Sequence, residues 1–217
     1  MSTSPIELPA PASRSAAGFL RSLGAGLLLV CAGCASPPAV HLHTLMPVER
    51  PVPLQGAAAE GSGPAIDLEP VRVPAQVDQA QWLVRLPDDT LALLEQERWA
   101  APLPDELHQA LLEIFRLRFG AVDTRALAAG LPYWRIGVTI TRFETAPGEA
   151  RLESVWALTP RSARAPALRC TSYFRESAGA GVPALAEAHR RAIARLGDAI
   201  GEQLLALQRG ASGRCPS

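Results

Sequence analysis

The residue types that could carry out catalysis are scattered along this 217-residue chain. Cys170 would be a candidate nucleophile if His108 or His189 lay beside it as a base, but no sequence motif supports such a pair. Asp88 and Asp89 follow a proline, and this pattern is typical of a turn rather than of a catalytic carboxylate pair. The chain has no Gly-x-Ser-x-Gly motif of a serine hydrolase and no lysine for a phosphate-binding loop. We therefore expect no catalytic residues and no enzymatic activity.

Patterns of metal ligands are missing from the sequence as well. His41 and His43 stand two residues apart, but a metal site needs further ligands. The chain has neither a His-Glu-x-x-His motif nor two Cys-x-x-Cys pairs. We expect no metal ion and no cofactor, and the two histidines are interpreted as ordinary residues of a connecting segment.

The most specific chemistry is expected at Cys34, near the N-terminus. Arg14 and Arg21 come before an apolar stretch of about ten residues, as in a secretory signal peptide. This stretch is too short to cross a bilayer, which takes about 20 residues. The segment Cys31-Ala32-Gly33-Cys34 that follows resembles a bacterial lipobox, although Cys31 stands where leucine is usual. We predict a lipoprotein signal peptide at residues 1–33 and fatty acyl chains such as palmitate on Cys34. An ordinary cleaved signal peptide is the alternative.

The residue after Cys34 bears on the location of the protein. Bacterial lipoproteins that stay at the inner membrane often carry aspartate there, whereas this chain has Ala35. We therefore expect an outer-membrane location, with the protein lipid-anchored and facing the periplasm. A lipoprotein carries more than one acyl chain, and a second chain is what makes such an anchor stable.

The composition is that of a folded protein. Hydrophobic residues make up 48% and charged residues 19%, and 21 basic residues balance 21 acidic ones. A disordered chain needs low hydrophobicity and high net charge, and a nucleic-acid binder usually has an excess of basic residues. The sequence therefore indicates a globular module and no nucleic-acid partner.

The chain after Cys34 divides into three parts by composition. Residues 34–64 are rich in Pro, Ala and Gly and are predicted to be a tether, because prolines break helices and stiffen the chain. Residues 65–209 form the predicted domain, and residues 210–217 a flexible tail. Cys170 and Cys215 could pair in an oxidising compartment, but Cys215 lies in this tail, so the sequence leaves their pairing open and favours free thiols.

Hydrophobic periodicity gives the order of secondary structure inside the domain. Alternating residues predict six strands and residues at helical spacing predict two helices. The strands are expected near 66–69, 81–86, 90–94, 134–141, 152–158 and 168–176, and the helices at 104–119 and 183–209. This order predicts a single α+β domain with a mostly antiparallel sheet and both helices packed on one face. Gly197 and Gly201 in the second helix indicate close packing on the sheet.

A short segment between the third strand and the first helix is the candidate binding site. Arg98 and Trp99 are residue types favoured at interfaces, and Pro102 followed by Leu103 gives the corner a fixed shape. We predict that these four residues contact a partner protein. The alternative is that Trp99 is a core aromatic residue.

Several of these segments together resemble a known family, the ABC-type transport auxiliary lipoproteins of MCE-type lipid transport systems. The resemblance covers about residues 64–208 and includes the lipobox at Cys34. Trp82 and Val77 replace the usual Ile and Leu, and both remain apolar. The matching segments are Ile66-x-Leu68-x-Pro70-Val71-x-Val73-Pro74, Val77-Asp78, Gln81-Trp82-Leu83-Val84-Arg85, Glu97-Arg98-Trp99-Ala100-x-Pro102-Leu103, Arg142-Phe143 and Leu152-x-x-x-Trp156-x-Leu158.

The resemblance implies a non-catalytic lipoprotein subunit of an intermembrane lipid transport system. Its partner would be a periplasm-spanning MCE-domain protein, and phospholipid and further copies of this chain are also raised as partners. Another envelope adaptor, for lipopolysaccharide or outer-membrane protein assembly, is the main alternative. A periplasmic enzyme would need clustered polar groups in a pocket, and a lipid carrier a large apolar cavity.

Overall fold

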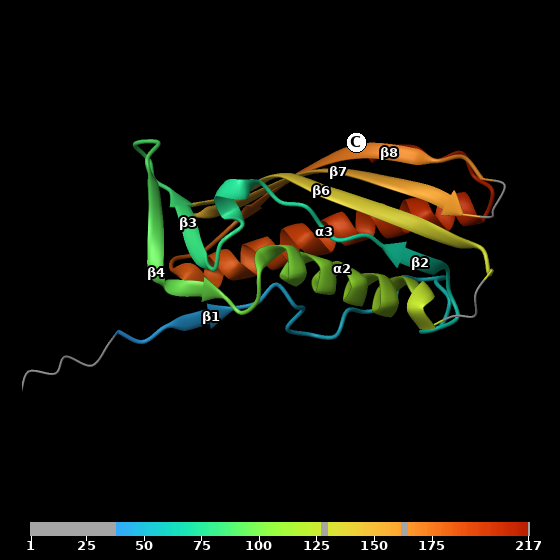
Figure 1. Cartoon of the computed structure of the whole chain (residues 1–217), viewed down its shortest axis with the longest axis horizontal. Helices are drawn as coiled ribbons and strands as arrows, with labels where there is room; N and C mark the ends of the chain where they lie inside the picture. The colour runs from blue at the N-terminus through green and yellow to red at the C-terminus, as the bar shows by residue number, and fades with distance from the viewer. Residues whose placement is uncertain (1–37, 127–129, 162–164, 217) are drawn as a thin grey trace, which may run out of the picture. The chain divides into compact units, whose positions relative to one another are not determined.

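The computed structural model describes residues 38–126, 130–161 and 165–216, and Ala39–Ser217 form one compact unit. The predicted signal peptide and Cys34 lie outside the described residues. The unit is an α+β fold with an eight-stranded sheet and two long helices (Figure 1). None of the helices described is both long enough and apolar enough to cross a membrane.

Three long antiparallel strands form the main part of the sheet. They are β6 (Tyr133–Ala146), β7 (Glu149–Arg161) and β8 (Leu168–Ser177). Buried residues alternate with partly exposed ones along β6 and β7, which is the period of two that predicted these strands. The β6–β7 hairpin turns at Gly148, whose φ of 79° favours glycine.

The other edge of β6 pairs with chain segments that run parallel to it. β2 (Ala65–Leu68) pairs with the start of β6, and β3 (Gln81–Arg85) pairs with its end. Between them Pro70 and Pro74 interrupt the pairing, because proline has no N–H to donate. The sheet is therefore mixed, and the prediction of a mostly antiparallel sheet of about six strands is corrected in these two respects.

The remaining short elements complete the sheet and its connections. β4 (Leu91–Trp99) pairs antiparallel with β3, and β1 (His41–His43) adds to β4 in parallel. β5 (Val122–Asp123) lies beside β2. Two 3₁₀ turns, Ala75–Val77 and Thr124–Ala126, lie before β3 and after β5.

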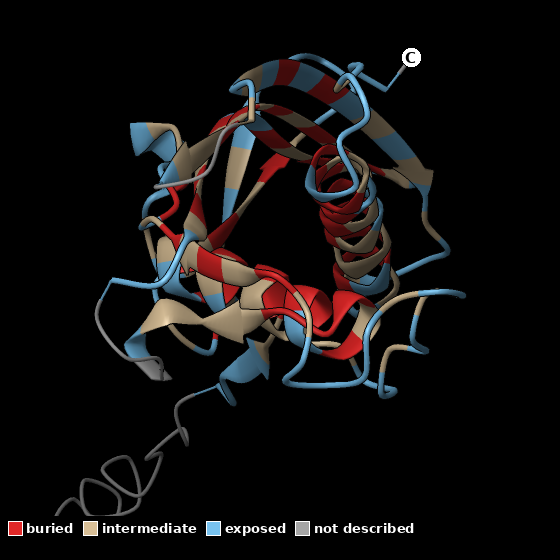
Figure 2. Ribbon diagram, turned by 90° about the vertical axis from the view of Figure 1, so that its right-hand side faces the viewer, coloured by how far each residue is buried: buried red, intermediate tan, exposed pale blue. Residues whose placement is uncertain are grey.

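Two helices lie on the concave side of the sheet, where the buried residues gather (Figure 2). α2 (Leu103–Phe119) ends at Gly120, whose left-handed φ of 67° makes it the expected C-terminal stop. α3 (Val182–Gln208) packs on β7 and β8 and against α2. Two helices on one face of the sheet are what the sequence predicted, and the α+β class is confirmed.

The two glycines of α3 face α2 rather than the sheet. A Cβ atom at Gly197 would lie 2.7 Å from the side chain of Ile114, and one at Gly201 would overlap the ring of Phe119. Such contacts are closer than van der Waals separation, so the two helices approach closely only because these positions have no side chain. The prediction of close packing is confirmed, but its partner is a helix.

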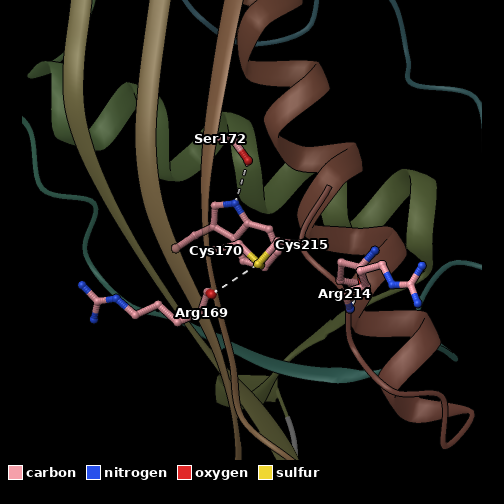
Figure 3. The surroundings of a disulfide bond; sticks show 7 residues. Arg169, Cys170, Ser172, Arg214 and Cys215 are labelled. Carbon is pink, nitrogen blue, oxygen red and sulfur yellow. Dashed lines mark hydrogen bonds between the residues drawn. A yellow bond between two sulfur atoms is a disulfide. The ribbon is translucent and has the colours of Figure 1, made fainter. Parts of the chain in front are cut away.

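The C-terminal segment is attached to the sheet by a disulfide bond. Cys215 bonds to Cys170 of β8, which is buried beneath it (Figure 3). The backbone N–H of Arg214 donates to the side chain of Gln203 in α3, and Gly213 lies against Leu207. The expectation of a flexible tail and free thiols is therefore wrong, because the chain folds back from α3 far enough to bring the two sulfurs together.

Candidate functional site at the N-terminal edge of the sheet

The segment that leads from Cys34 into the domain is built into the sheet. His43 lies opposite Trp99 in the parallel β1–β4 pair, and the N–H of Ala100 donates to the carbonyl of His43 at 2.8 Å. The predicted tether at residues 34–64 is therefore wrong from residue 39 onward. Its prolines prevent a helix, but they do not prevent a short strand at the edge of a sheet.

A buried carboxylate of α2 fastens the next part of this segment. Glu106 is 6% exposed and accepts hydrogen bonds from the Thr44 hydroxyl and the Leu45 N–H, both at 2.7 Å. Leu45 is itself 1% exposed and belongs to the core. From α3, Arg190 donates to the carbonyl of Thr44 at 3.1 Å. The segment is thus held by both helices, and its release would expose a core leucine and leave a buried carboxylate without partners.

The two histidines of β1 share one carboxylate of β4. The Nδ1 of His41 lies 2.9 Å and the Nε2 of His43 lies 2.5 Å from the two carboxylate oxygens of Glu97. These hydrogen bonds, first from His43 and then from His41, lower the pKa of Glu97. Among the residues that the structure describes, no three His, Cys, Asp or Glu side chains form a group that could hold a metal ion. The histidines serve to close the β1–β4 edge.

An aromatic cluster lies directly beneath this edge. The rings of Trp82 and Trp99 stack at 4.3 Å, and Phe143 stacks on His189 at 4.1 Å. The Nε2 of His189 lies 2.8 Å from the hydroxyl of Thr145. Burial lowers the pKa of His189 to about 3, so the ring is neutral near neutral pH. Buried in this cluster, it cannot exchange protons with a substrate in solution.

The structure separates the four residues that were predicted to contact a partner. Trp99 and Leu103 are buried, whereas Arg98 is partly exposed and Pro102 is exposed. The prediction that Trp99 and Leu103 offer a contact surface is therefore wrong. Trp99 is the last residue of β4, and its ring stacks on Trp82. Leu103 is the first residue of α2, and its side chain lies in the core. The alternative interpretation of Trp99 as a core aromatic residue is confirmed.

The other candidates for chemistry also have structural roles. Cys170 is in a disulfide bond, so its thiol is not a nucleophile next to a histidine. Asp88 and Asp89 form the turn between β3 and β4, as expected. Hydrogen bonds from Thr90, first from its hydroxyl and then from its N–H, lower the pKa of Asp88.

Sequence reasoning missed the most important polar residue of this region. In the sequence, the position of Glu106 was explained by the helix dipole, which favours acidic residues in the first turn of a helix. Its burial and its two bonds to Thr44 and Leu45 depend on contacts 61 and 62 residues apart in the chain. A signal for β1 was present in the alternation of His41, Leu42 and His43, but three residues among prolines are too few to predict a strand.

These features define a compact α+β module that begins at Ala39, five residues after Cys34, and whose first strand begins at His41. Residues 44–201 match the family model of the ABC-type transport auxiliary lipoprotein component, and the chain belongs to this family. It is therefore a lipoprotein of an ABC-type transport system, and the resemblance seen in the sequence is confirmed.

Solved structures show the same fold at low sequence identity. A crystal structure of an uncharacterized protein is 15% identical, with a TM-score of 0.61, over 77% of this chain and 99% of that chain. A crystal structure of a protein from Xanthomonas campestris is 17% identical, with a TM-score of 0.56, over 79% of this chain and 98% of that chain. No curated protein matches the chain.

Proposed function

We propose that this chain is a non-catalytic outer-membrane lipoprotein subunit of an MCE-type lipid transport system. In this proposal fatty acyl chains on Cys34 hold it at the periplasmic face of the outer membrane, and it docks with a periplasm-spanning MCE-domain protein. The cargo that passes through the assembly is phospholipid. In this proposal the lipid on Cys34 anchors the chain, and its role requires no metal or cofactor.

The observation that supports this function best is the short distance between the expected anchor and the folded module. Ala39, where the compact unit begins, follows Cys34 by five residues. Fully extended, they reach about 18 Å. A module held this close to one membrane has a high effective concentration for any partner that reaches the same membrane. This geometry suits a docking subunit and explains why the segment after the anchor is fastened so firmly.

The side chains of the described region support a structural rather than a chemical role. His189 is buried and neutral, Cys170 is oxidised, and Glu97 is occupied by two histidines. Each of these groups is enclosed or occupied within the fold, where an enzyme would leave it free for a substrate.

Crosslinking in intact cells, followed by purification of the full chain from membranes, tests this function. We expect an MCE-domain protein to be recovered together with an ABC permease and ATPase. Cys34→Ala should abolish recovery, because the variant lacks its anchor, whereas Cys31→Ala should keep it. Recovery of a lipopolysaccharide or outer-membrane protein assembly complex instead would support the alternative adaptor role and contradict the proposal.

A further inference from the structure

Exposed apolar side chains gather at the end of the molecule where the chain enters the fold. Among the residues described, nine large hydrophobic side chains are exposed, and five of these belong to β1, to β4 or to the residues next to β1 and β3. We call these five the apolar face: Val40, Leu42, Leu86, Leu91 and Leu93. Leu42 is the most exposed of the five, at 65%. Exposed apolar side chains that gather on one part of a surface indicate a contact surface.

The register of the β3–β4 pair puts Leu91 and Leu93 on the outer side of the sheet. Leu93 lies opposite Leu83 on β3, whose neighbours Trp82 and Val84 are buried on the other side. Because side chains alternate along a strand, Leu93 and Leu91 point away from the core.

Leu42 also points away from the core, at the part of β4 that follows the register shift between Leu94 and Arg98. It pairs with Arg98, which precedes the buried Trp99 and therefore points outward. Leu42 also lies between His41 and His43, which turn toward Glu97. β1 and β4 form one end of the molecule in Figure 1, so the apolar face is an end surface of the sheet.

We propose that the apolar face lies against the lipid bilayer that holds the acyl chains of Cys34. The proposal rests on the lipid anchor of the proposed function and adds the surface by which the module meets the membrane. Val40 is six residues after Cys34 and Leu42 eight residues, so they lie within about 22 Å and 29 Å of the anchored residue. Because β1 is fixed to β4, an anchor at Cys34 keeps this face within reach of the bilayer.

The charges beside the face indicate how it binds. Arg85 and Arg98 are offset by the exposed acidic residues Asp88, Asp89 and Glu95 of the same hairpin. A surface that binds membranes through anionic lipids carries an excess of basic residues. Here the contact depends on burial of leucine and valine side chains, so it should form on zwitterionic lipid and should not weaken as salt increases.

Lipid quenching of a fluorescent amino acid tests this surface in the full acylated protein. The probe is placed at position 93 or, as a matched control, at position 131. Leu131 is also exposed, but it lies just before the start of β6, whereas β3 pairs with the end of β6. β6 has 14 residues, which span about 46 Å. In vesicles of phosphatidylcholine with spin-labelled lipid, we expect quenching at 93 and none at 131, at low and at high salt.

A second set of variants tests the leucines themselves. With the probe at position 42, Leu91→Glu combined with Leu93→Glu should abolish quenching, and Leu131→Glu should leave it unchanged. All three leucines are exposed, so the variants should keep the circular dichroism spectrum and unfolding midpoint of the parent protein.

Four outcomes would overturn the proposal. Equal quenching at 93 and 131 would mean that no surface is preferred. Protection of position 93 only when membrane proteins are added would make the face a protein interface. If the protein does not float with vesicles at all, the lipid anchor is absent and the proposed function fails too. Flotation without quenching at 93 overturns the membrane face alone.

Discussion

The two ends of the folded module are both attached to its core, but by different physical means. The N-terminal segment is held by noncovalent contacts: the β1–β4 pairing, the burial of Leu45 and the bonds of Glu106. The C-terminal segment makes a few contacts with α3, and one covalent bond between Cys170 and Cys215 fixes it to the sheet. The first attachment is lost only when the core opens, whereas the second can be removed by a reductant.

This difference matches the loads that the two ends would carry. The N-terminal segment joins the module to its proposed membrane anchor, so it transmits any pull from the membrane. Because it is part of the core through Leu45, a pull on it is resisted by the whole cooperative fold. The C-terminal segment carries no such connection in the proposal, and a crosslink that stabilises the fold is sufficient there.

The largest expected effect is on the noncovalent attachment. Leu45→Ala leaves a cavity at a fully buried position, so we expect the free energy of unfolding to fall by about 4 kcal/mol. Denaturant titration measures the change. Val48→Ala is the control, because Val48 is 77% exposed and the variant should stay within about 0.5 kcal/mol of the parent. Equal stability of the two variants would show that the segment is a loose tether after all.

Removal of the covalent attachment should have a somewhat smaller effect. The disulfide spans 45 residues of sequence, and Cys215→Ala should lower the free energy of unfolding by about 3 kcal/mol. Hydrogen exchange should accelerate at residues 211–216 and remain slow at residues 41–46, because the two attachments are independent. Faster exchange at both ends would show that the two regions are coupled.

The buried carboxylate of Glu106 should contribute less to the free energy of unfolding than Leu45 or the disulfide bond. Glu106→Ala removes the acceptor for Leu45 N–H and the Thr44 hydroxyl, and we expect a loss of about 2 kcal/mol together with faster exchange at the Leu45 amide. Glu113→Ala is a control on the same helix, where the carboxylate pairs with Arg116 at the surface. It should change stability by less than about 0.5 kcal/mol. An unchanged Leu45 amide in Glu106→Ala would contradict the attachment.

Acid should weaken the fold through the buried His189. The unfolded chain protonates His189 near the ordinary histidine pKa of 6.5, whereas the folded chain, in which the ring is buried, does so only near a pKa of about 3. The unfolded state therefore binds more protons between these values, and stability falls as the pH decreases, by up to about 1.4 kcal/mol per pH unit. His189→Phe should reduce this slope in denaturant titrations across the range. A slope that the substitution does not change would assign the acid sensitivity to other groups.

Much of the fold was predictable because it rests on local patterns. The alternation in β6 and β7, the apolar stripe of α2 and the stop at Gly120 are all visible in short windows of sequence. β1 was not predictable, because its partner Glu97 is 56 residues away and its own three residues carry too little signal. The disulfide depends in the same way on how the chain returns after α3.

The candidate site was predicted less well than the fold. A tryptophan beside an arginine fits an interface and a core equally, and only the stacking of Trp99 on Trp82 decides between them. The apolar face was missed because Leu91 and Leu93 alternate as core residues of a strand would, and the sequence does not tell which side of β4 faces the core.

The most direct test of the central claim is the mass of the N-terminal peptide of the mature protein isolated from membranes. The account predicts a peptide that begins at Cys34 and carries fatty acyl chains on that residue. A peptide with an unmodified Cys34, or a mature chain that begins after it without lipid, would contradict the account.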